Sequence, residues 1–374
     1  LVQNPSFSEE GVQEVSNGSF SQEGTEQISN GNFSNWTNDN PDNWIVFNED
    51  VNNYVTESLS GGELRMVSDD TATLQIRQDG IITSGATYKI DVDVTEVISG
   101  SIRFQLNNQQ QILDTVGSFT FYVTADVSGF FAITRQEACD VTIDNVSVRE
   151  VGQDWTLETG WSIAENKAIQ DGTGSGNNGD IIQNASLDAS KTYKIVLEVT
   201  EYTQGTLYVD TANIDLNING VGTYTLYFSP SSNFLYIRTR YSNFIGSITN
   251  ISVKEVGMDW VFGSGFSIGN DVAIGTSATG VLYTNITITS SNKARIKADV
   301  DISGGGIQLR VGGVSLGYFY DNIDYVFTSN GNGLVEFVGQ SFTGSITNIS
   351  VIEITSDTNL PRISYENFSY QDVL

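Results

Sequence analysis

The sequence VTIDNVSVREV at residues 141–151 recurs as ITNISVKEV at residues 248–256 and as ITNISVIEI at residues 346–354. The first two copies stay aligned over a long stretch at a spacing of 105 residues, so that Tyr88 matches Tyr193. The third copy follows the second after 98 residues. Solenoid units are roughly 20–50 residues long, whereas this period is the size of a domain. The sequence therefore predicts a string of homologous modules.

Alternating apolar and polar residues predict five strands in the second module, at residues 192–199, 205–209, 222–228, 235–238 and 248–256. Turn residues between them and many β-branched residues favour two packed antiparallel sheets. Gly is abundant at 37 residues, Pro is scarce at 4, and no helical stripe of useful length appears. The predicted fold class is all-β, with three tandem antiparallel β-sandwich, jelly-roll-like modules in an elongated chain. The matching segments are residues 87–94, 100–104, 117–123, 130–134 and 141–151 in the first module, and residues 293–300, 306–310, 324–328, 334–338 and 346–354 in the third.

The joints between modules are short. No Pro/Ser-rich linker separates them, and a single glycine, Gly152 or Gly257, leads into the next unit. Such joints predict modules stacked end to end with limited freedom. The expected domains are residues 1–30 as a segment of short repeats for assembly or docking, residues 31–151, 152–256 and 257–355 as the three modules, and residues 356–374 as a C-terminal connector.

A second, shorter repeat occupies the N-terminal segment. NPSFS at residues 4–8 recurs as NGSFS at residues 17–21 and as NGNFS at residues 30–34, a spacing of 13. One Phe and two aliphatic residues per unit cannot bury a core of their own. We therefore expect this segment to pack on a neighbour, to self-associate or to stay flexible. Self-association would make the protein a homo-oligomer, for example a trimer.

The charge balance excludes several partners. Seventeen basic residues stand against 45 acidic ones, a formal net charge of −28. Nucleic-acid binding needs a basic surface, and an anionic bilayer repels this chain. No apolar stretch approaches the ~20 residues of a membrane span, so membrane insertion is not expected. The acidity is explained first by solubility and second by calcium binding.

The calcium candidates are Asp39 and Asp42, which lie in the acidic sequence NDNPDN at residues 38–43. Several oxygen ligands stand close together there, as calcium requires. The spacing is not that of a defined calcium loop, however, and Pro41 favours an ordinary turn. Calcium is the one cofactor that the sequence brings into consideration.

The chain lacks residue types that common catalytic sites require. It contains no histidine and a single cysteine, Cys139. Ser-His-Asp and Cys-His arrangements and His-containing zinc sites are therefore excluded. Cys139 falls just before a closing strand, which favours a small buried residue over a nucleophile. We expect no enzyme activity.

Aromatic residues fall into two groups. Those that recur from module to module are expected in a core or a module joint. Those that do not recur, Tyr54, Tyr202 and Tyr241, are predicted in loops and are the candidates for glycan binding, because sugar rings stack on exposed aromatic faces. The recurring ones are Trp155 and Trp161, their counterparts Trp260 and Phe266, and Trp36 and Trp44 in the first module.

The closing strands also contain Asn-x-Ser triplets. Examples are Asn145-Val146-Ser147 and Asn250-Ile251-Ser252. In a sequence so rich in Asn and Ser, such triplets are expected by chance, and no role is predicted for them.

Several of these phrases together resemble repeat modules of tailed-bacteriophage tail and fibre proteins, which look like carbohydrate-binding-module jelly rolls. The short repeats resemble the lead-in that often precedes such modules, and NLPRI at residues 359–363 is similar to a connector found before further lectin-like domains. The phrases are NGNFS at residues 30–34 with Trp36 and Trp44, DWT at residues 154–156, GWSI at residues 160–163, KTYKI at residues 191–195 and GSITNISVKEV at residues 246–256.

The resemblance implies a structural and adhesive protein at a virion surface or outside a cell. Its implied partners are further copies of itself, other virion structural proteins and host surface glycans, each glycan contact being weak and multivalent. Two alternatives stay open at this stage. One is a bacterial extracellular fibrous adhesin that polymerises through its termini, and the other is the glycan-binding portion of a larger secreted enzyme.

Overall fold

The computed structural model describes residues 1–106, 109–174, 179–239 and 241–354. The predicted connector at residues 356–374 lies outside the described residues. Within them every regular element is a β-strand, and every strand pair is antiparallel. The predicted all-β class with tandem β-sandwich modules is confirmed. The described part of the chain contains no helix long and apolar enough to cross a membrane.

The first module packs two sheets face to face. Sheet A contains the closing strand that ends at Val151, and sheet B covers it. Sheet A runs in the order β12 (Gly117–Thr124), β9 (Thr87–Ser99), β14 (Cys139–Val151), β7 (Leu64–Ser68), β6 (Asn53–Glu57). Sheet B runs in the order β11 (Gln109–Leu113), β10 (Ile102–Leu106), β13 (Gly129–Arg135), β8 (Gln75–Ile82), β5 (Ile45–Phe47), and β3 (Trp36–Thr37) pairs separately with β4 (Asn40–Pro41).

The second module repeats this plan. Its five predicted strands are all found, although the one predicted at residues 205–209 is only two residues long, β20 (Tyr208–Val209). Sheet A runs in the order β16 (Trp161–Ala164), β17 (Lys167–Gln170), β24 (Ile245–Val256), β19 (Thr192–Gln204), β22 (Gly222–Phe228). Sheet B runs in the order β15 (Thr156–Leu157), β18 (Asp180–Asn184), β23 (Phe234–Arg238), β20 (Tyr208–Val209), β21 (Ile214–Asp215).

The third module differs because two long strands, β29 (Lys293–Val311) and β32 (Leu334–Ile354), run through both of its sheets. The sequence predicted each of them as two separate strands. Their pairing shifts register near Gly305, whose φ is +68° and whose missing Cβ leaves room for the Ser341 carbonyl oxygen. The remaining strands are β25 (Val261–Phe262), β26 (Phe266–Gly269), β27 (Val272–Ala278), β28 (Val281–Asn285), β30 (Val314–Phe319) and β31 (Ile323–Thr328).

Each module has its own apolar core. The alternation that predicted the strands also places their side chains, because successive residues of a strand point to opposite faces. In β19, Tyr193, Ile195 and Leu197 are buried while the residues between them are half-buried. Burying a large apolar side chain stabilises the fold by roughly 1.5–3 kcal/mol, so each module carries enough apolar residues for an independent core.

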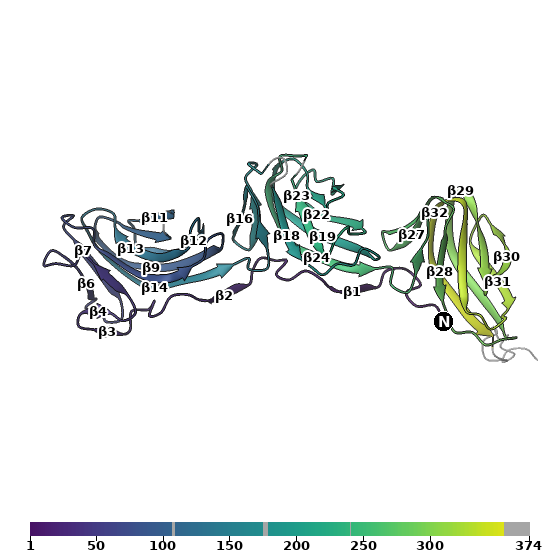
Figure 1. Ribbon diagram of the computed structural model, residues 1–374, viewed down its shortest axis with the longest axis horizontal. Coiled ribbons are helices and arrows are strands. Elements are labelled where there is room, and N and C mark those ends of the chain that lie inside the picture. Colours follow the sequence, from purple (N-terminus) through teal and green to yellow (C-terminus); the bar gives the residue numbers. More distant parts are fainter. Residues whose placement is uncertain (107–108, 175–178, 240, 355–374) are drawn as a thin grey trace, which may run out of the picture.

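The joints are tight. Gly152 and Gly257 have φ values of +73° and +72°, a conformation that side chains rarely adopt. A Cβ on Gly152 would lie 2.1 Å from Cδ1 of Ile163 in the next module. The three modules therefore follow one another without a spacer, and Figure 1 shows them in a row along the long axis of the molecule.

Residues 1–34, which we call the strap, run back along this row. The strap repeats contact the modules in reverse order: Phe7 lies in the core of the third module, Phe20 in that of the second and Phe33 in that of the first. Two short strap strands, β1 (Glu10–Gln13) and β2 (Glu23–Glu26), pair with β24 and β14. In Figure 1 both lie along the same side of the molecule. Of the three outcomes expected for this segment, packing on a neighbour is the one observed, and the neighbours belong to the same chain.

Candidate functional site

Each strap repeat inserts a phenylalanine beside a tryptophan of one module. The three phenylalanine side chains are at most 1% exposed, and aromatic pairs at such distances stabilise by about 0.5–1.5 kcal/mol beyond their buried area. The sequence correctly placed these tryptophans in a core or joint, but Trp36 has no counterpart in the other modules. The ring centroids are 5.0 Å apart for Phe7 and Trp260, 5.3 Å for Phe20 and Trp155, and 5.6 Å for Phe33 and Trp44.

The asparagine three residues before each phenylalanine shapes the turn. Asn17 has a φ of +47°, a left-handed conformation that asparagine tolerates better than most residues. Its carbonyl oxygen accepts hydrogen bonds from the Phe20 N–H at 3.0 Å and from Nε1 of Trp155 at 3.1 Å. Its Oδ1 accepts from the Gln22 N–H at 3.1 Å. Asn4 and Asn30 make the equivalent bonds on their own modules.

The modules receive the strap at an asparagine in each closing strand. Asn250 has a φ of +52° and interrupts the pairing of β24 with β19. The next N–H, that of Ile251, thereby leaves the ladder and donates to the Gly18 carbonyl oxygen at 2.9 Å. These asparagines belong to the Asn-x-Ser triplets that the sequence analysis attributed to chance, and that interpretation was wrong. The equivalent bonds run from Val146 N to Gly31 O and from Ile349 N to Pro5 O, each at 2.9 Å, after Asn145 and Asn348 with φ of +53° and +51°.

In two of the three strap repeats, the strap backbone lies too close to the closing strand for a side chain to fit between them. A Cβ on Gly18 would lie 2.0 Å from the Ile251 carbonyl oxygen, and a Cβ on Gly31 would lie 2.0 Å from that of Val146. Such distances require backbone to move, so glycine is needed at both positions. This explains the Asn-Gly dipeptides of the second and third repeats.

Ion pairs fix the strap strands. Glu23 lies 2.7 Å from Nζ of Lys89 and 3.1 Å from Nη1 of Arg149 in the first module. Glu10 lies 3.0 Å from Nζ of Lys194 and 2.9 Å from Nζ of Lys254 in the second module. The hydrogen bond from Lys254 is the main cause that lowers the pKa of Glu10, and the bond from Lys89 does the same for Glu23.

The three tyrosines predicted as glycan contacts are not brought together. Tyr54 is half-buried in β6 of the first module, and Tyr202 lies in β19 and packs on the core of the second. Their predicted placement in loops was wrong. Tyr241 does lie between strands and is 66% exposed.

Tyr241 belongs to an aromatic strip on the outward face of sheet B in the second module. Its ring meets that of Tyr208 edge to face at 5.5 Å. Tyr208 stands opposite Arg238, whose guanidinium lies 5.6 Å from the ring of Tyr236. The Arg238 side chain is held by Asp180 at 2.8 Å, with only 11% and 4% of the two side chains exposed. The sequence missed Tyr208, Tyr236 and Arg238, although the alternation of Tyr236 and Arg238 with buried residues in β23 was a usable signal.

The first module carries a different set on the same face. Arg77 lies between two aromatic rings, 4.3 Å from that of Phe47 and 5.0 Å from that of Phe130. In the third module the exposed aromatic residues among those described are Tyr318, Tyr320 and Tyr325, at 58%, 71% and 38%. The outward faces of the modules therefore differ more than their strap contacts do.

The calcium candidates lie in a tight turn. Asp39 is exposed with a φ of +66° and connects β3 to β4, and Asp42 follows β4. The turn expected from Pro41 is present. No group of three or more acidic or cysteine residues suited to a metal ion occurs in the described part of the chain. Cys139 is buried as predicted, and burial raises the pKa of its thiol to about 11.

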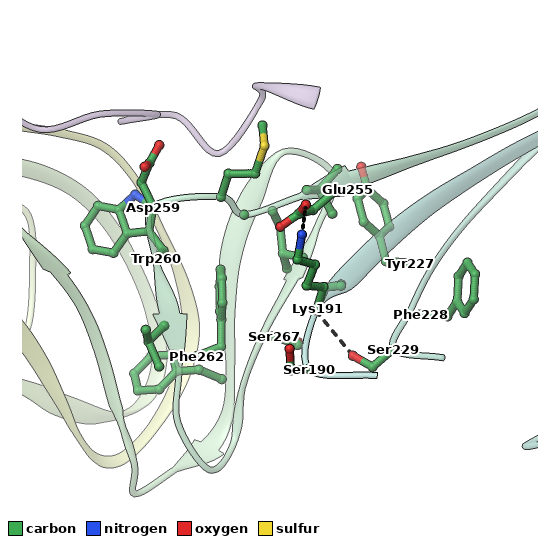
Figure 2. A pocket seen from close by; sticks show the side chains of 17 residues that line it. Ser190, Lys191, Tyr227, Phe228, Ser229, Glu255, Asp259, Trp260, Phe262 and Ser267 are labelled. Atoms are coloured by element: carbon green, nitrogen blue, oxygen red, sulfur yellow. Dashed lines mark hydrogen bonds and ion pairs between the residues drawn. The ribbon is translucent and has the colours of Figure 1, made fainter. Parts of the chain in front are cut away.

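A cavity of about 430 Å³ lies at the joint of the second and third modules. Lys191 Nζ and Glu255 Oε2 are 2.7 Å apart on one side, and Trp260 and Phe262 lie on the other (Figure 2). The first joint has Glu150, Trp155 and Leu157 at the matching positions. The glutamate and the tryptophan recur in both joints, which indicates a role in joining modules, whereas Ala86 stands where the second joint has Lys191.

Comparison with known proteins assigns no family. No family model matches the sequence, and no curated protein matches it. Among solved structures, the tandem CBM22-1 and CBM22-2 domains of Xyn10C from Paenibacillus barcinonensis match at 12% identity and a TM-score of 0.29, over 62% of this chain and 98% of that one. A chain of the triple jelly-roll and turret assembly of an archaeal virus matches at 15% identity and a TM-score of 0.20, over 83% and 88%. A chain of Sulfolobus Turreted Icosahedral Virus matches at 14% identity and a TM-score of 0.22, over 81% and 90%.

Likeness at this level carries no argument about family or function. What the fold itself defines is a class of protein, a tandem array of β-sandwich modules joined by an N-terminal strap.

Removing one strap phenylalanine should weaken the module that it enters. Phe20→Ala leaves a cavity beside Trp155, and loss of a buried phenylalanine costs about 3–5 kcal/mol in the free energy of unfolding. Denaturant unfolding followed by tryptophan fluorescence measures this loss. Val12→Ala is the matched control, because Val12 is a strap residue that is 75% exposed. Equal unfolding midpoints for the two variants would contradict the packing described above.

The asparagine of the closing strand can be tested by two substitutions. Asn250→Gly keeps the left-handed conformation and loses only the amide bond to Glu198, which is 2.8 Å long. Asn250→Ala loses the amide bond and also disfavours the left-handed conformation. Its free energy of unfolding should therefore be about 1–2 kcal/mol lower than that of Asn250→Gly. Thermal or denaturant unfolding gives the comparison, and equal stability of the two variants would show that the conformation is not limiting.

Strap binding should weaken in acid. Because the pKa values of Glu10 and Glu23 are lower in the folded chain than the usual 4.5, their contribution to stability is complete above that value and is lost as the pH falls through the folded pKa. Between about pH 6 and pH 3 the native chain should lose more stability than the Glu10→Gln/Glu23→Gln variant. Glu9→Gln, which removes an exposed strap carboxylate, serves as the control and should follow the native chain.

Proposed function

We propose that this protein is a structural and adhesive component of a virion surface, a fibre or appendage that presents its modules for weak, multivalent contact with host glycans. The observation that carries the proposal is the strap, which ties three modules to one segment and so fixes their spacing. Sites held at fixed spacing act at high effective concentration, so that weak single contacts add up to strong attachment. The sequence resemblance to phage tail and fibre modules supports the virion assignment.

The best candidate for glycan contact is the aromatic strip of the second module. Tyr208, Tyr236 and Tyr241 offer ring faces at the surface of sheet B, and Arg238 offers hydrogen-bond donors among them. Stacking on aromatic rings with a few fixed polar groups is how proteins hold sugar rings. The buried partner Asp180 holds the Arg238 side chain in place, so the strip is ordered before a ligand arrives.

The alternative of a polymerising adhesin requires a different arrangement of the strap. An adhesin that polymerises through its N-terminal segment would need the strap phenylalanines to leave three buried positions. The strap phenylalanines are buried within one chain, so their burial does not require a second copy. Homo-oligomerisation, for example as a trimer, remains a proposal that needs another interface.

The glycan role can be tested on the full chain. Tyr241→Ala and Tyr236→Ala should each weaken binding to an immobilised panel of bacterial surface polysaccharides, by about three- to tenfold for one lost aromatic contact. Tyr320→Ala removes a tyrosine of similar exposure from the third module and is the matched control. Binding unchanged by both strip substitutions would reject the strip as the contact. Absence of binding to any polysaccharide would favour a purely structural role.

A further inference from the structure

The cavity at the joint of the second and third modules has the size of a small-molecule site (Figure 2). Its volume is about 430 Å³, whereas ligand pockets occupy about 300–1,000 Å³ and lie preferentially at interfaces between domains. Residues of both modules line it, and the half-buried ring of Phe262 contributes an apolar wall. A molecule bound in this cavity would therefore contact two modules at once.

Polar groups that can still form hydrogen bonds line the same cavity. The Lys191 ammonium group donates to Oε2 of Glu255 at 2.7 Å, and Glu255 is its only partner among the described residues. An ammonium group has three N–H bonds, so two of them can donate to a ligand, and Oε1 of Glu255 can accept. The two side chains are 43% and 20% exposed, so a ligand can reach both.

The first joint shows that this lysine is not needed to join two modules. Ala86 stands there in place of Lys191, and Leu157 stands in place of Phe262. Glu150, the counterpart of Glu255, has no ion-pair partner in the described part of the chain, and burial raises the pKa of its carboxyl. A joint of this kind therefore forms with the glutamate alone, and Lys191 and Phe262 need another explanation.

The chemistry of these groups fits an uncharged ligand with many hydroxyl groups. Lys191 and Glu255 together carry no net charge and place hydrogen-bond donors next to an acceptor. An anionic ligand would be repelled by the carboxylates of Glu255 and of Asp259, which also lines the cavity. An aromatic wall beside a few fixed polar groups suits a sugar ring, which has an apolar face and a polar edge.

We propose that this cavity binds one neutral sugar residue, whose hydroxyl groups bond Lys191 and Glu255 and whose apolar face packs against Phe262. The proposal rests on the proposed glycan contact for its class of ligand and adds a second site to the aromatic strip. Because its walls belong to two modules, this site exists only while the second joint keeps its geometry.

The two methionines of the chain provide the test. Met258 lines the cavity, and Met66 is 1% exposed in the core of the first module. In the full chain with labelled methionine methyl groups, titration with glucose, galactose or N-acetylglucosamine should shift the Met258 signal saturably for at least one sugar and leave Met66 unchanged. No saturable shift with any of the three would overturn the proposal, as would a shift with the anion glucuronate alone.

A substitution taken from the first joint makes the test specific. Lys191→Ala should weaken sugar binding at least about tenfold, because hydrogen bonds to a charged group are lost. Its unfolding midpoint should not change, since Ala86 already occupies this place in the first joint. Lys167→Ala is the matched control, because it removes a lysine of the same module that pairs with Glu201 at 3.1 Å and does not line the cavity. Equal affinity of the two variants would contradict the proposal.

One further variant separates this site from the aromatic strip. Tyr241→Ala should leave the Met258 titration unchanged while it weakens attachment to immobilised polysaccharide. A Met258 response in a chain that attaches to no polysaccharide would support the cavity site and reject the proposed function. Attachment to polysaccharide without a Met258 response would reject the cavity site and leave the proposed function standing.

Discussion

The arrangement of this protein depends on one backbone feature, the left-handed asparagine in each closing strand. A regular antiparallel strand inside a sheet uses its N–H and C=O groups on both sides. The bulge at Asn145, Asn250 and Asn348 takes one N–H out of the ladder and turns it toward the strap carbonyl. Without that bulge the phenylalanine of each repeat would lack its backbone anchor. Three copies of the bulge give three equivalent receiving sites, and the 13-residue repeat of the strap matches them one by one.

The strap gives the array a property that the modules alone lack. Its first phenylalanine and the tryptophan that receives it are 253 positions apart in the sequence (260 − 7), so this contact joins the two ends of the row of modules. Long-range contacts of this kind are costly in loop-closure entropy and form late. Once formed, each one hinders the bending of the joints at Gly152 and Gly257. The row of modules is thus stabilised along its length by contacts that lie outside the joints.

The sequence predicted the module count, the strands and the burial of the recurring tryptophans, because period, alternation and recurrence are local signals. It did not predict where the strap packs. Phe20 and Trp155 are 135 residues apart (155 − 20). The residues around each of them contain no signal that identifies the other as its partner. The role of Asn250 was missed for a different reason. In a sequence rich in asparagine, an asparagine required by a bulge cannot be distinguished from one that is present by chance. The aromatic strip was missed because Tyr208 lies in a strand of only two residues, too short for alternation to show its face.

The modules of this one chain agree where they receive the strap and differ on their outward faces. The tryptophan that receives the strap phenylalanine and the bulge asparagine recur in all three modules, as Trp44, Trp155 and Trp260 and as Asn145, Asn250 and Asn348. The outward faces of the modules do not recur, since Arg77 between two phenylalanines stands in the first module and Arg238 among tyrosines in the second. The strap accounts for the agreement, because each module must offer the same tryptophan pocket and the same free N–H to an equivalent repeat. No such shared contact constrains the outward faces, and that is where the modules differ.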